Sequence, residues 1–371
     1  MNPICTSVHV RVPATSANLG SGFDTVGLAL DYHDELTFTL NDDPSDGVAH
    51  VIIHGEGEDT LPRDETHLVV STFRRACATL GLGRLGFTLE ATNNIPQARG
   101  MGSSAEAIVA GIAAAAAFAQ PGELNRAAIF DMAAVIEGHP DNVAPAVFGG
   151  LTVSWDFTTA EGVGSVSIPG GEPLHGGFHT INYPVDPAIT AAVFVPDYEL
   201  STEKARQALP KEILHKDAVY NVSRVGLLPA AMNPVVLAQA AAQGGAESLG
   251  AGAAGVGAAG TGAAGAGTAV SPAAFATAAA QANALLFTAT QDRLHQPYRG
   301  SLMPPSTELI GLFRSKGYAA AVSGAGPCVL VLHYGDARAA IDEVASSQLA
   351  SGHWRALHLP INTTGVEIER S

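Results

Sequence analysis

Short runs of alternating apolar and polar residues predict strands along the first half of the chain. Residues 8–12, 36–40 and 87–89 each follow a period of two, which places their apolar side chains on one face of an extended segment. Between the second and third runs, the apolar positions of residues 69–80 fall on one face of a helix. Gly81 is well placed to end that helix, because glycine adopts the left-handed conformation common at helix C-termini.

The same mixture of patterns continues through the rest of the chain. An Ala-rich helix, buried on most sides, is predicted over residues 103–118, and a later helix over residues 341–349. Further strands are predicted at residues 191–195, 319–322, 328–332 and 356–359. Because strands and helices are interspersed without a strict βαβ repeat, the pattern predicts an α+β fold in two domains.

One stretch fits neither pattern. Residues 230–291 contain a single charged residue, Glu247, and the sequence from Gly244 to Gly267 is almost entirely Ala and Gly. Glycine costs about 1 kcal/mol per helical position relative to alanine, and no large side chain is present to be buried. We expect a flexible insertion at about residues 244–268, between two helices. A role in interaction or assembly is the alternative.

The charge balance argues against nucleic acids and anionic membranes as partners. The chain has 19 Lys+Arg and 35 Asp+Glu, a formal net charge of -16, so it would repel both kinds of polyanion. Cys5, Cys77 and Cys328 are widely spaced and odd in number, which indicates reduced thiols. Because no leader or membrane-spanning run is recognisable, the sequence predicts a cytoplasmic protein.

The most informative segment is residues 93–105, Asn-Asn-Ile-Pro-Gln-Ala-Arg-Gly-Met-Gly-Ser-Ser-Ala, which joins a predicted strand to the Ala-rich helix. Gly100 and Gly102 let the backbone approach a ligand closely, and the helix start behind them offers unpaired N–H groups to phosphate oxygens. The segment lacks the Gly-Lys-Ser/Thr of a Walker A loop. A helix cap without a ligand is the alternative. Glu106 follows in the first helical turn, and we expect its carboxylate to point away from the phosphates.

Three segments, in their order along the chain, resemble the three motifs of the GHMP kinases. The segment at 93–105 is similar to the second motif, residues 12–24 to the N-terminal motif in its homoserine kinase form, and residues 323–327 to the third. The resemblance implies an N-terminal domain with a left-handed βαβ unit, expected over residues 1–174. It implies a ferredoxin-like C-terminal domain, expected over residues 175–371. The implied reaction is ATP-dependent phosphorylation of the side-chain hydroxyl of L-homoserine, a step of threonine biosynthesis.

The resemblance also implies where the nucleotide, the metal and the acceptor hydroxyl bind. Phosphoryl transfer needs Mg²⁺, for which Glu137 and Ser104 are the expected ligands. The expected nucleotide-binding residues are Pro96, Gln97, Ala98, Arg99, Gly100, Met101, Gly102, Ser103, Ser104, Ala105 and Glu106. Asp24, His139 and Asn142 join Glu137 as expected catalytic residues. Since Asn142 stands where mevalonate kinase-like members have an aspartate, the resemblance implies attack without a dedicated base.

Homoserine carries a carboxylate and an ammonium group, which need charged partners. Arginine binds carboxylates best, because its planar fork makes two parallel hydrogen bonds. Arg224 and Arg299 resemble the arginines of homoserine kinase segments that hold this carboxylate. Asn18 and Asp24 are expected to hold the ammonium or hydroxyl group. His139 and Asn142 are expected to complete the substrate pocket.

Two other functions remain open at this point. Another GHMP kinase, acting on mevalonate or a sugar, would share the fold and the phosphate loop. A non-catalytic sensor of the same fold would bind the ligands without turnover, but Ser103, Ser104 and Glu137 are all present and favour catalysis. The expected partners are therefore L-homoserine and ATP, and a homodimer is left open as the assembly.

Overall fold

The computed structural model describes residues 1–234 and 272–371. The Ala/Gly-rich insertion expected at about residues 244–268 lies outside the described residues, so that expectation stays a prediction. Most of the elements predicted from the sequence patterns are found, including the helix that ends at Gly81.

The larger sheet combines strands from both ends of the chain. Its order is β13-β1-β2-β4-β3, with β5 pairing β2 and β8 pairing β5. The strands are β1 (Ser7–Ala17), β2 (Val26–Leu40), β3 (Ala49–Gly55), β4 (Phe87–Asn93), β5 (Leu151–Phe157), β8 (Gly177–Tyr183) and β13 (Glu367–Arg370). Strands β3 and β4 are parallel and are joined through helix α1 (Leu68–Leu80), so they form a βαβ unit. The chain makes short β6 (Ser165–Val166) and β7 (Leu174–His175) in the arm between β5 and β8.

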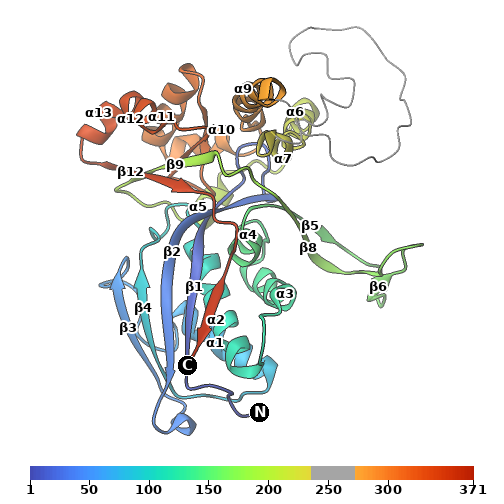
Figure 1. The fold of residues 1–371 in the computed structure, drawn as a ribbon, viewed down its shortest axis with the longest axis vertical. Helices are drawn as coiled ribbons and strands as arrows, with labels where there is room; N and C mark the ends of the chain where they lie inside the picture. The colour runs from blue at the N-terminus through green and yellow to red at the C-terminus, as the bar shows by residue number, and fades with distance from the viewer. Residues whose placement is uncertain (235–271) are drawn as a thin grey trace.

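Four helices cover one face of this sheet (Figure 1). They are α1 (Leu68–Leu80), α2 (Ser103–Ala119), α3 (Arg126–Glu137) and α4 (Val143–Phe148). Val8, Val10 and Val12 of β1 are fully buried beneath them, as the period of two predicts. The small side chains of α2 let it pack closely, because a Cβ on Gly111 would lie 2.7 Å from the carbonyl oxygen of Val69 in α1.

The smaller sheet is antiparallel throughout and has the order β10-β11-β9-β12. Its strands are β9 (Ile189–Pro196), β10 (Ala319–Val322), β11 (Val329–Tyr334) and β12 (Trp354–Pro360). The helices of this half are α5 (Thr202–Gln207), α6 (His215–Val225), α7 (Leu228–Ala231), α9 (Pro272–Ala289), α10 (Gln296–Arg299), α11 (Pro304–Ser315), α12 (Arg338–Val344) and α13 (Ser346–Ala350). The single helix expected at residues 341–349 is thus two short helices that meet at the buried Ala345.

The larger sheet also contains strands from the later part of the chain. Strand β13, at the end of the sequence, returns to pair with β1, and β8 extends the larger sheet through β5 (Figure 1). Both strands lie beyond residue 174, so the division into residues 1–174 and 175–371 stays a prediction. In the part of the chain that is described, no helix is long and apolar enough to cross a membrane.

Candidate active site

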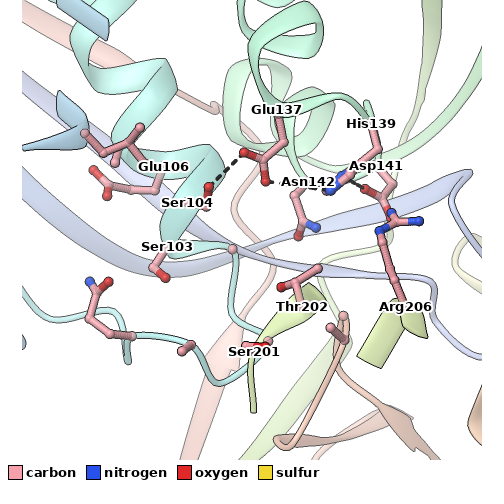
Figure 2. Close-up of a pocket in the computed structure, with 18 of the residues that line it drawn as sticks. Ser103, Ser104, Glu106, Glu137, His139, Asp141, Asn142, Ser201, Thr202 and Arg206 are labelled. Atoms are coloured by element: carbon pink, nitrogen blue, oxygen red, sulfur yellow. Dashed lines mark hydrogen bonds and ion pairs between the residues drawn. The ribbon is translucent and has the colours of Figure 1, made fainter. Parts of the chain in front are cut away.

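A cavity of about 450 Å³ receives side chains from both halves of the molecule. The β1–β2 turn contributes Asn18 and Asp24, and the start of α2 contributes Ser103 and Ser104. The end of α3 and the turn after it, helix α5, α10, residues from the segment 61–69 and residues 324–325 also contribute to the lining. Figure 2 shows polar side chains of this lining, among them Ser103, Glu137 and Arg206, converging from separate segments.

The phosphate loop opens the N-terminus of α2 toward this cavity. Gly102 stands at the helix N-cap with φ 77°, and no side chain caps the helix. A Cβ at Gly102 would lie 1.9 Å from the Thr15 Oγ1 atom, and a Cβ at Gly100 would lie 2.1 Å from the Ser323 carbonyl oxygen. Only glycine fits at either position. The backbone N–H groups of the first turn of α2 therefore carry the partial positive charge of a helix start into the cavity.

Most of the expected nucleotide-binding residues line the cavity. Those that do are Gln97, Ala98, Gly100, Gly102, Ser103, Ser104 and Glu106. Pro96, Met101 and Ala105 belong to the same segment, but their side chains are buried in the protein. Arg99 lines a separate hollow with Glu56, about 3.8 Å from its carboxylate.

Glu106 is buried, and its carboxyl group meets that of Asp34. Asp34 Oδ1 accepts hydrogen bonds from the backbone N–H groups of Asn94 (2.6 Å) and Ile95 (2.8 Å), at the start of the phosphate loop. Burial, with the neighbouring charge of Asp34, raises the pKa of Glu106 well above its usual value, and burial raises the pKa of Asp34 to about 6. Burial and the neighbouring charge of Asp34 thus both favour the neutral form of Glu106, which brings no carboxylate charge to the cavity.

Ser104 and Glu137 form the oxygen-rich corner in which we expected a metal. The Ser104 hydroxyl donates to Glu137 Oε2 at 2.8 Å, and burial raises the pKa of Glu137. Hydroxyl and carboxylate oxygens are suitable ligands for Mg²⁺, which usually keeps waters and substrate phosphates as its other ligands. The hydroxyl and carboxylate oxygens of Ser104 and Glu137 fit such a partial site. Among the described residues, no group of three or more His, Cys, Asp or Glu side chains that could hold a metal is found.

His139 lies between two carboxylates in the turn after α3. Its Nδ1 atom is 3.0 Å from Asp141 Oδ1, and its Nε2 atom is 3.9 Å from Glu137 Oε1 (Figure 2). Burial alone would lower the pKa of His139, but the hydrogen bond and charge of Asp141, with the charge of Glu137, raise it overall. The imidazole thus tethers two acidic groups of the cavity wall.

The side chains of Asn142 and Asn18 are held by hydrogen bonds to other segments of the cavity wall. Asn142 Oδ1 accepts from the Thr15 hydroxyl at 2.8 Å. Asn18 donates from Nδ2 to the Gly324 carbonyl oxygen at 2.8 Å, and its Oδ1 accepts from the backbone N–H of Asp24 at 2.9 Å. The third Gly-rich motif is thereby fastened to the first.

Arg206 on α5 lines the cavity beside Asp24, and we did not predict it there. Its guanidinium makes two hydrogen bonds to Asp24, of 3.0 and 2.9 Å. The pairing raises the pKa of Arg206 although its burial acts in the opposite direction. The segment Ser201-Thr202-x-Lys204-Ala205-Arg206 was the signal that could have identified it, because Ser201 caps α5 and both Thr202 and Arg206 line the cavity.

Arg299 lies where we expected it, in the cavity wall, and only 2% of it is exposed. Its Nε atom donates to the Ala205 carbonyl oxygen at 3.2 Å, and its Nη1 atom is 3.3 Å from His295 Nδ1. Because His295 Nε2 donates to the Gly20 carbonyl oxygen at 2.8 Å, Nδ1 is the accepting nitrogen of a neutral ring. Burial lowers the pKa of His295, which agrees with that neutral state.

Arg224 does not line the cavity. Its guanidinium stacks 3.2 Å over the Tyr220 ring, and its Nε atom donates to Gln291 Oε1 at 3.0 Å. In the structure, both Arg299 and Arg206 therefore line the cavity wall, and Arg224 lies outside it.

Comparisons with known proteins find related sequences and structures over nearly the whole chain. Residues 67–150 match the family model of the GHMP kinases N terminal domain, and residues 272–350 match that of the GHMP kinases C terminal domain. The homoserine kinase of Clavibacter michiganensis subsp. michiganensis is 37% identical over 98% of this chain and 94% of its own length. That of Cutibacterium acnes is 40% identical over 88% of both chains. The crystal structure of homoserine kinase from Cytophaga hutchinsonii superimposes with a TM-score of 0.70 at 22% identity, covering 100% of this chain and 99% of that one, and shows the same fold.

Proposed function

Because the chain belongs to the homoserine kinases of the GHMP kinase family, we propose that its cavity transfers the γ-phosphoryl group of ATP to L-homoserine. The products are O-phospho-L-homoserine and ADP, which places the reaction in threonine biosynthesis. One observation supports this most directly: an uncapped helix N-terminus and an Asp–Arg pair line the same cavity.

The nucleotide end of the cavity is the start of α2. Its free N–H groups, with the Ser103 hydroxyl, suit the oxygens of a triphosphate. Ser104 and Glu137 would hold Mg²⁺, which offsets the negative charge of the phosphate oxygens when it is bound. The neutral Glu106 avoids a second carboxylate charge beside that site.

The acceptor end is complementary to a zwitterion. Asp24 and Arg206 neutralise each other in the absence of a ligand. An amino acid presents an ammonium group to Asp24 and a carboxylate to Arg206, so each charge of the pair gains a partner as the two separate. Arg299, which is fixed by His295 and the Ala205 carbonyl oxygen, supplies the second cation for the carboxylate.

The transfer itself needs positioning more than proton abstraction. The homoserine hydroxyl oxygen bonds to the γ-phosphorus as the bond from that phosphorus to the ADP oxygen breaks. Since the transition state is loose, alignment and charge stabilisation supply most of the rate. His139 and Asn142 line the cavity between the nucleotide end and the acceptor end, where they are suited to hold the reacting groups.

The test is ADP release by the purified protein with Mg-ATP. L-homoserine should give turnover, whereas 4-hydroxybutyrate, which lacks the ammonium, and 3-amino-1-propanol, which lacks the carboxylate, should each lower kcat/KM at least about tenfold, because a charged group of the half-buried Asp24–Arg206 pair is left without a partner. Mevalonate serves as the control for another GHMP activity. Turnover of mevalonate without turnover of L-homoserine would reject the proposed substrate.

A further inference from the structure

Thr15, beneath the phosphate loop, contacts both that loop and the turn that carries Asn142. Thr15 lies in β1, is only 1% exposed, and its backbone N–H donates to the Met101 carbonyl oxygen at 3.0 Å. Its hydroxyl packs against Gly102, where an added Cβ would come within 1.9 Å of Oγ1. The same hydroxyl donates to Asn142 Oδ1 at 2.8 Å. A rigid strand therefore holds the amide of a residue in the cavity wall.

The direction of that hydrogen bond orients the Asn142 amide. An amide has an accepting oxygen and a donating NH2 group, and here the oxygen faces the Thr15 hydroxyl, which donates to it. Oδ1 is turned to Thr15, and within residues 1–234 and 272–371 no hydrogen bond is found for Nδ2. Because Asn142 lines the cavity, its NH2 group is the part left for a ligand.

We propose that Thr15 is a positioning residue that holds Asn142 as a hydrogen-bond donor toward the oxygens that react during phosphoryl transfer. This inference rests on the proposed function. The phosphoryl group and the acceptor oxygen both carry negative charge as they exchange partners, so a donor stabilises them and a carbonyl oxygen would repel them. Asn142 takes up no proton in this role, and without the Thr15 hydroxyl its amide is free to turn its oxygen to the phosphate.

The first experiment removes the hydroxyl at constant shape. Thr15→Val should lower kcat about tenfold or more, while KM for ATP and for L-homoserine stays within about twofold, because the donor acts on the transition state. Thr15→Ser, which keeps the hydroxyl, should retain most of kcat. If Thr15→Val leaves kcat unchanged, or if Thr15→Ser loses as much as Thr15→Val, the positioning role is wrong.

A double-mutant cycle separates positioning from a loss of packing. In an Asn142→Ala background the Thr15→Val change should lower kcat less than about twofold, because the amide that it orients is already gone. A full tenfold loss in that background would overturn the proposal. Melting temperatures establish that each variant is folded, and Thr15→Ala replaces Thr15→Val in the cycle if the valine variant does not fold.

The orientation of the amide has its own test in Asn142→Asp. This variant keeps the acceptor for Thr15 but places a carboxylate oxygen where the NH2 group was, so kcat should fall about 100-fold or more. Retained or increased activity would mean that an oxygen belongs there, and would overturn the donor assignment. Failure of the wild-type protein to phosphorylate L-homoserine would instead reject the proposed function, so the two failures are distinguishable.

Discussion

At the scale of single residues, the Asp24–Arg206 pair makes the sharpest prediction about the acceptor. Arg206→Gln removes the charged partner of the substrate carboxylate but keeps hydrogen-bonding capacity, so KM for L-homoserine should rise about 10- to 100-fold. KM for ATP should change little, because the nucleotide end lies at the start of α2. Steady-state kinetics with each substrate varied in turn measures both constants.

The matched control for that substitution is Arg224→Gln. Arg224 is also an arginine on a helix of the same half, but it stacks on Tyr220 and does not line the cavity. Its replacement should leave both KM values within about twofold. An Arg224→Gln variant with the larger effect on homoserine would return the carboxylate to the residue that the sequence resemblance indicated.

The buried pair of Glu106 and Asp34 predicts a dependence of stability on pH. The folded-state pKa of Glu106 lies well above 4.5, so the folded protein binds more protons than the unfolded chain above about that pH. Its contribution to the free energy of unfolding therefore falls as the pH rises. Glu106→Gln has no ionisable group at this position, so its melting temperature should gain on the wild type between pH 5 and pH 8.

The control for this pH dependence is Glu172→Gln, because Glu172 is exposed on the arm between β5 and β8. The melting temperature of Glu172→Gln should run parallel to that of the wild type across the same pH range, measured without nucleotide. A constant difference between Glu106→Gln and the wild type would show that Glu106 is ionised throughout, and its raised pKa would be wrong.

The sequence predicts single residues well where a local motif carries them. Ser104 and Glu137 meet as expected, because Ser104 stands at the start of the predicted Ala-rich helix and the family resemblance implied Glu137 as its partner at the metal. The sequence predicts poorly where two distant segments decide the chemistry. From the sequence alone, Glu106 is an unfavourable charge beside the phosphates. In the structure it lies beside Asp34 of strand β2, and no periodicity along the chain shows which buried carboxyl groups become neighbours.

At the scale of elements, the start of α2 depends on the absence of a Cβ at Gly102. Gly102→Ala combines a left-handed backbone with a contact of 1.9 Å to Thr15, so it should displace the loop, weaken ATP binding and lower the melting temperature. Gly81→Ala is a matched control, because Gly81 has φ 76° but nothing within 4 Å of the added Cβ.

The comparison of these two variants separates backbone strain from steric contact. Gly81→Ala should cost only the strain, about 1–2 kcal/mol in the free energy of unfolding, with KM for ATP unchanged. Gly102→Ala should cost more and also raise KM for ATP. Equal effects of the two variants on stability and on KM would show that Gly102 serves only as a helix cap.

Element prediction succeeded where one pattern dominates and failed where tertiary contacts decide. The alternation in β1 and the glycine after α1 were sufficient for their positions. The break between α12 and α13 has no glycine or proline to signal it, because it falls at Ala345, whose methyl group packs into the core of the smaller sheet. The pairing of β13 with β1 also left no signal in residues 367–370, since a pairing partner is not encoded in the period of one strand.

At the scale of the whole molecule, the cavity forms where the two sheets share one hydrophobic core. Leu28 of β2 packs in the same cluster as Val193 of β9 and Leu330 of β11. The Asn18–Gly324 hydrogen bond crosses the same junction. Both the nucleotide end and the acceptor end therefore depend on the sheets staying together, which a pair of independent domains would not ensure.

This shared core predicts that the chain unfolds in one cooperative transition. If the halves were independent, calorimetry would show two heat-absorption peaks, or a van't Hoff enthalpy well below the calorimetric one. Because Leu28, Val193 and Leu330 lose their contacts when either sheet unfolds, we expect a single peak with the two enthalpies nearly equal. L-homoserine at 100 times its Kd should add about 2.7 kcal/mol to the free energy of unfolding and shift that peak as a whole. A ligand that moved only part of the heat absorption would mean that Asp24 and Arg206 unfold separately, and that the cavity is assembled from two units rather than built into one.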